Sequence, residues 1–233
     1  MYHPFSVAET IRIAWFILKK NFPTIAVYSL VTLLIVFIIG FVTYNVIADS
    51  VLTSIGVIVL LVGISFLFLG FIKLIFQLID REFYDFEFRD IIPGIKMMYS
   101  YLLLLIIVST LSVIMTNLIK NLDEGMTQSL LGIFIGIFFQ FFFLFYFPIC
   151  TCFIVDDGSG PFESVMQSYE LIKGNFFKYF ILFVIIETVL FLASLTIIGM
   201  LFVIPLVNIV LVVAYRKLIY SHLDVDDDIA ETN

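Results

Sequence analysis

The sequence predicts an all-α, polytopic membrane protein with about six transmembrane helices. Of its 233 residues, 62% are apolar and 13% are charged, and the mean hydropathy is +1.17. A soluble domain is nearer half apolar and a quarter charged. The other two observations are a set of long apolar stretches and a regular alternation of basic residues between the loops that join them.

Six apolar stretches are long enough to cross a bilayer, which takes about 20 mainly apolar residues per helix. They cover residues 24–47, 51–78, 99–118, 130–155, 179–198 and 200–219. Together they place residues 1–223 in one integral membrane domain. Much of the net charge of -7 lies in the acidic residues of 224–233, a composition typical of a disordered tail.

Basic residues lie on alternate loops, which predicts the orientation of the chain. On one side are Arg12, Lys19, Lys20, Arg81, Arg89, Lys96, Lys173, Lys178, Arg216 and Lys217, whereas the opposite loops carry only Lys120. Because cytoplasmic loops hold the excess of Lys and Arg, we expect both termini in the cytoplasm.

Amphipathic segments precede the first and fifth spans. Ser6 and Glu9 have the spacing of a capping box, and a second segment covers residues 161–175. The two align without gaps at an offset of 154, where Glu9, Lys19, Asn21 and Phe22 match Glu163, Lys173, Asn175 and Phe176. With a third stretch at 84–98, these segments predict three units, each a cytoplasmic interfacial helix followed by two spans. The alternative is that all three merely reflect what juxtamembrane helices require.

A short polar motif follows the fourth span. Its candidate site residues are Asp156, Asp157, Gly158, Glu163, Ser168, Lys173 and Asn175. With Pro148 before it and Ala214-Tyr215-Arg216-Lys217-Leu218 after it, this region resembles a superfamily of bacterial membrane proteins that includes YciC-like proteins and the membrane domain of some glycerophosphodiester phosphodiesterases. The resemblance implies a multi-span helical fold in the bacterial inner membrane. It implies no catalytic residue, because the phosphodiesterase's soluble barrel has no counterpart here.

Glu187 is the one acidic residue deep within a predicted span. Counted from Lys178 it lies about 13 Å into the membrane at 1.5 Å per residue. Similar counting places Gln140 and Asn208 near the same depth, which predicts a midplane polar layer of these three residues. The layer either relays a proton or binds a polar group of a solute, or it fixes helix register through interhelical hydrogen bonds.

No motif for a catalytic reaction, a cofactor or a metal ion occurs in the sequence. Cys150 and Cys152 have no His or Cys partner at metal-ligand spacing and are interpreted as reduced packing residues. No basic surface suited to nucleic acid is present. We therefore expect a non-catalytic protein that organises or assembles the membrane envelope through lipid, a membrane-protein partner or a second copy. The alternative is a transporter or channel that uses the layer around Glu187.

Overall fold

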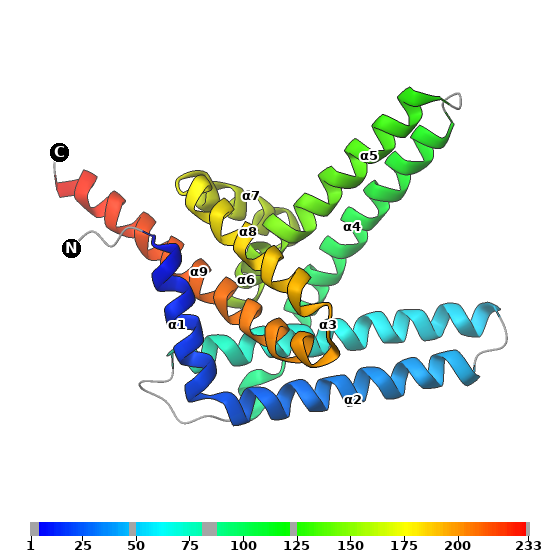
Figure 1. Ribbon diagram of the computed structural model, residues 1–233, viewed down its shortest axis with the longest axis horizontal. Coiled ribbons are helices and arrows are strands. Elements are labelled where there is room, and N and C mark those ends of the chain that lie inside the picture. The colour runs from blue at the N-terminus through cyan, green and yellow to red at the C-terminus, as the bar shows by residue number, and fades with distance from the viewer. Residues whose placement is uncertain (1–4, 47–49, 81–87, 122–124, 232–233) are drawn as a thin grey trace. The chain divides into compact units, whose positions relative to one another are not determined.

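The computed structural model describes residues 5–46, 50–80, 88–121 and 125–231, and every regular element within them is helical. In chain order these are α1 (Val7–Lys20), α2 (Phe22–Val46), α3 (Ser50–Asp80), the 3-10 helix η1 (Phe88–Ile91), α4 (Ile95–Lys120), α5 (Met126–Phe141), the π-helix η2 (Phe142–Tyr146), α6 (Phe147–Asp156), α7 (Pro161–Lys173), α8 (Phe176–Ala193) and α9 (Ile197–Glu231) (Figure 1). The predicted all-α class is confirmed.

Six helical stretches of the described residues are long and apolar enough to cross a membrane. They are Phe22–Tyr44, Gly56–Asp80, Arg89–Lys120, Met126–Asp156, Phe176–Ala193 and Gly199–Tyr220. The chain is therefore a multi-pass membrane protein. The fifth span ends earlier than predicted, because a turn follows Ala193 and the Thr196 hydroxyl accepts the backbone N–H of Gly199, 3.1 Å away, to begin α9.

The α-helical geometry of the fourth span is interrupted just before Pro148. A proline has no N–H to donate and its ring clashes with the carbonyl four residues earlier, so a helix loosens upstream of it. Pro148 follows the π-helical turn Phe142–Tyr146, which links α5 to α6. The interruption therefore widens the helix and does not end the span.

The predicted repeat is confirmed in the secondary structure of its first and last copies. Helices α1 and α7 begin at Val7 and Pro161, and the spans behind them begin at Phe22 and Phe176, both pairs 154 residues apart. The middle copy differs. Residues 84–87 of its predicted helix lie outside the described residues, and the remainder is split between the four-residue η1 and the start of α4 at Ile95, since Pro93 excludes its neighbour from helical geometry.

The chain divides into two compact units, and the single membrane domain expected for residues 1–223 stays a prediction. The first unit comprises residues 1–94 and 170–233, and the second comprises residues 95–169. Helix α9 continues to Glu231, through most of the segment expected to form a tail. Extending an existing helix gains a backbone hydrogen bond for each residue without a new nucleation step.

In the first unit, α1 packs lengthwise and antiparallel against α9. Ala14, Ile17 and Leu18 are buried on its packed face. At one end Lys217 lies 2.7 Å from Glu9, and at the other the rings of Phe22 and Phe202 stack with centroids 5.8 Å apart. Part of the amphipathic face predicted for a membrane surface thus packs against a helix of its own unit, whereas Trp15 of that face stays 48% exposed.

Helix α3 also contacts α9 in this unit. The Arg216 guanidinium lies 2.8 Å from the Asp80 carboxylate and 4.9 Å from the centre of the Phe76 ring, and Phe76 meets Tyr215 edge to face. Helix α9 is therefore the central element of the unit, joined to α1 and α3 by an ion pair each.

Candidate functional site

The structure does not bring the predicted midplane layer together as a hydrogen-bonded set. Glu187 in α8 and Asn208 in α9 are half-buried in the first unit, whereas Gln140 in α5 belongs to the second unit and is exposed. The Asn208 amide donates to the Ile204 carbonyl of its own helix over 2.8 Å. Among the described residues no hydrogen bond joins Asn208 to Glu187, so their role as a pair stays a prediction.

The residues of the motif after the fourth span shape the turn between α6 and α7. Helix α6 ends at Asp156, and Gly158 takes a φ of +66°, a left-handed conformation that favours glycine. Asp156 and Asp157 are exposed on the rim of this turn. The Lys96 ammonium lies 3.8 Å from the place that a Cβ on Gly158 would occupy.

Helix α7 is held at its start by side chains of the same motif. The Glu163 carboxylate accepts the Gly160 N–H over 3.2 Å, half of a capping box, and the Ser159 hydroxyl lies 2.8 Å from Gln167. Ser168 is fully buried and donates to the Ser164 carbonyl over 2.6 Å. The described contacts of Gly158, Glu163 and Ser168 thus serve the turn and the packing of α7.

The last two residues of that motif lie at the junction of α7 and α8. Lys173 is exposed in the last turn of α7, where a cation favours the helix dipole. Asn175 is the N-cap of α8 and accepts the Tyr179 N–H through its backbone carbonyl, 3.0 Å away. Both residues end or begin helices.

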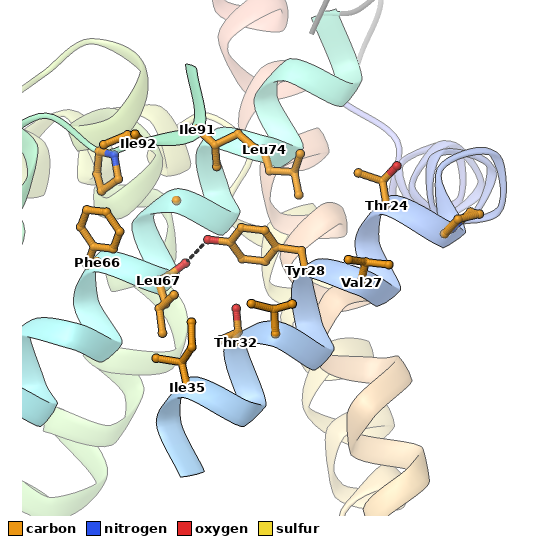
Figure 2. A pocket seen from close by; sticks show the side chains of 14 residues that line it. Thr24, Val27, Tyr28, Thr32, Ile35, Phe66, Leu67, Leu74, Ile91 and Ile92 are labelled. Carbon is orange, nitrogen blue, oxygen red and sulfur yellow. Dashed lines mark hydrogen bonds between the residues drawn. The ribbon is translucent and has the colours of Figure 1, made fainter. Parts of the chain in front are cut away.

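A different site, which the sequence did not predict, lies between α2 and α3. We call it the α2–α3 groove. It has a volume of about 600 Å³ and is closed at one end by the segment that follows η1 (Figure 2). It is lined by Pro23, Thr24, Val27, Tyr28, Val31, Thr32, Ile35, Phe66, Leu67, Gly70, Leu74, Ile91, Ile92 and Pro93. The lining is almost wholly apolar, and Val27 and Val31 keep 62% and 48% of their surface exposed.

A second cavity of about 300 Å³ lies where α2, α3 and α9 meet. Three lining residues are shared with the groove, namely Tyr28, Thr32 and Leu67, so this part of the α2–α3 pair separates the two spaces. Asn208 and Ser29 are among its polar members. Of the three residues predicted for the midplane layer, Asn208 is the one that lines this cavity.

Tyr28 is the fixed partition between the two spaces. Its hydroxyl donates to the Leu67 carbonyl over 2.8 Å, and its ring stacks on Phe71 with centroids 5.4 Å apart. A Cβ added to Gly70 would lie 2.6 Å from that hydroxyl oxygen, closer than atoms of this kind approach. Gly70 is therefore required for Tyr28 to reach its acceptor.

Sequence reasoning missed this site because its residues carry no motif. Tyr28 and Gly70 lie 42 positions apart in apolar stretches, and neither is unusual in a span. The one available signal was a tyrosine within a predicted span, since its hydroxyl needs a partner in a setting without water.

Comparisons of the chain with protein-family models, with curated proteins and with solved structures found no match. The resemblance to the YciC-like superfamily stays a prediction, and the site is interpreted from its own geometry.

Proposed function

We propose that this multi-pass membrane protein has no catalytic reaction and acts by organising the membrane through contacts with lipid, with a partner membrane protein or with a second copy. The observation that carries the proposal is the α2–α3 groove. Its lining is apolar over about 600 Å³, and its rim is exposed on helices long enough to cross a membrane. Such a groove favours hydrocarbon over a polar substrate.

The proposal is tested by what the purified protein retains. We expect phospholipid to remain bound through extraction in mild detergent, and added lipid to raise the temperature at which the protein loses its monodisperse peak. In proteoliposomes the protein should leave an imposed proton or ion gradient intact. Loss of all phospholipid together with unchanged thermal stability on lipid addition would reject action through lipid.

The proposed location is the bacterial inner membrane with both termini in the cytoplasm. The alternation of basic residues supports this orientation. In a background with Cys150→Ser and Cys152→Ser, we expect Ser50→Cys and Ser221→Cys to react with an impermeant reagent from opposite sides of the membrane. Labelling of both positions from the same side would refute the six-span arrangement.

The second candidate function is transport of a small solute or ion. Asn208 and Ser29 in the second cavity favour it, as does Glu187 half-buried in α8. If Glu187 relays a proton, Glu187→Gln should abolish any flux that the wild-type protein shows, while the folded fraction stays the same. We expect no such loss, because this near-isosteric change preserves the packing of α8. Flux that disappears in this variant alone would support transport over our proposal.

A further inference from the structure

We infer that the α2–α3 groove binds one acyl chain of an anionic phospholipid, with the headgroup held at the end where Pro23, Leu74 and Ile92 lie. The inference rests on the proposed function and names its ligand. It also assigns the two ends of the groove different roles, one for the hydrocarbon chain and one for the charged headgroup.

The length of the groove matches a chain within one leaflet. Its lining runs along α2 from Pro23 to Ile35, which is about 18 Å at 1.5 Å per residue. The hydrocarbon core of a bilayer is about 30 Å thick, or about 15 Å per leaflet. A chain that enters beside Pro23 would therefore reach Ile35 near the middle of the bilayer.

The walls of the groove suit a flexible hydrocarbon. Leu74 and Gly70 are buried in α3 and form its floor, and Val27 and Val31 stand exposed on the rim of α2. Figure 2 shows Tyr28 reaching across to Leu67, so the polar atom of this tyrosine is already occupied by a backbone carbonyl. What remains for a ligand is apolar surface.

Basic residues flank the lining positions of the Pro23 end in the sequence. Lys19 and Lys20 are exposed at the end of α1, separated from α2 by Asn21, and Arg89 is exposed in η1, two residues before Ile91. Lys73 donates to the Ile92 carbonyl over 2.9 Å and so holds the segment that closes this end.

Asp90 in η1 carries the opposite charge. Among the described residues close in sequence to the lining of this end, basic side chains nevertheless outnumber acidic ones. An anionic headgroup fits this charge better than a zwitterionic one.

The test uses tryptophan fluorescence in vesicles. The chain has one tryptophan, so Trp15→Phe gives an empty background. Val31→Trp then reports from the rim of the groove. Leu34→Trp is the matched control, because Leu34 lies on the same helix, is 57% exposed against 48% for Val31, and does not line the groove. Phosphatidylglycerol and phosphatidylcholine with brominated acyl chains serve as quenchers.

We expect brominated phosphatidylglycerol to quench the Val31→Trp protein at a several-fold lower mole fraction than brominated phosphatidylcholine. At Leu34→Trp the two lipids should quench alike. Adding Lys20→Gln and Arg89→Gln together should abolish the preference, since a basic residue at an anionic surface contributes about 1 kcal/mol, or roughly fivefold in affinity. Lys217→Gln in α9, which lies beside Glu9 near the opposite end of α1, should leave the preference unchanged.

Three results would overturn the inference. Equal quenching by both lipids at both positions would mean that the groove contacts lipid in the same way as the rest of the helix surface. Quenching of Leu34→Trp without quenching of Val31→Trp would mean that protein, from this chain or a second copy, covers the groove. A preference that survives both charge removals would exclude the headgroup site. In each case phospholipid retention by the wild-type protein tests the proposed function separately.

Discussion

Replacing Gly70 by alanine tests whether the contact between Tyr28 and α3 holds the groove in shape. The new Cβ would lie 2.6 Å from the Tyr28 hydroxyl and 3.4 Å from the Ile91 carbonyl oxygen. Tyr28 would have to leave its 2.8 Å hydrogen bond to the Leu67 carbonyl, and the closing segment would have to shift. Gly70 is buried in α3, so the adjustment falls on Tyr28 and on the closing segment.

The expected loss of stability follows from three opposing effects. Overpacking costs about 1–3 kcal/mol and the lost hydrogen bond about 1 kcal/mol. Alanine in place of a helical glycine returns about 1 kcal/mol. We therefore expect Gly70→Ala to lower the free energy of unfolding by about 1–3 kcal/mol.

The measurement is unfolding in mixed micelles, with Gly136→Ala as the control. A Cβ on Gly136 in α5 would meet nothing within 4 Å, so that variant should be neutral or more stable by up to about 1 kcal/mol. Tyr28→Phe added to Gly70→Ala should recover part of the loss, because it removes the clashing oxygen. The reasoning fails if both glycine variants behave alike, or if Tyr28→Phe and Gly70→Ala are additive.

Two further predictions concern the turn after α6 and the ion pair of α9. Because Gly158 has a positive φ, Gly158→Ala should destabilise the second unit by about 1–2 kcal/mol, and Gly158→Asn should destabilise it less. Both are measured by the same unfolding method. Equal effects of the two substitutions would argue against a requirement for left-handed backbone geometry at this position. In a double-mutant cycle, Asp80→Asn and Arg216→Gln should show a coupling of about 0.5–1 kcal/mol that weakens in high salt, because the Asp80 side chain is 55% exposed. Arg216→Gln alone should lower the free energy of unfolding more than Asp80→Asn does, since it also removes the contact with Phe76. A coupling energy that does not change with salt would contradict the interpretation of a partly exposed pair.

Local patterns predicted the helices of this fold because each pattern depends on residues that are close together in the sequence. Apolar runs of sufficient length specify spans, and a Pro after a Gly turn specifies where a helix begins. Ser6 is the N-cap of α1 as its spacing to Glu9 predicted, but its side chain makes no capping hydrogen bond. The offset of 154, which matched Phe22 to Phe176, also separates the starts of α2 and α8, although the predicted spans began two and three residues later. The motif around Gly158 was also placed correctly in the chain, although its described contacts are those of a turn and a helix start.

The midplane layer of Glu187, Gln140 and Asn208 stays a prediction, because counting along helices gives depth alone. Depth follows from the rise per residue, but the direction in which a side chain points depends on the helices beside it. Gln140 falls in a different unit from Glu187 and Asn208, and Asn208 bonds to its own helix and lines a cavity with α2 and α3. No one-dimensional count contains that information.

Composition and local patterns are enough to establish that this chain is helical, apolar enough to be multi-pass, and built with a repeated segment before its first and last pairs of spans. The packing of α1 along α9, the ion pair of Lys217 with Glu9, and the bond from Tyr28 to Leu67 beside Gly70 became known from the folded chain. Membrane helices pack through close contact of side chains that are distant in the sequence. An apolar run constrains these contacts very little, because most of its residues suit lipid and helix neighbours equally well.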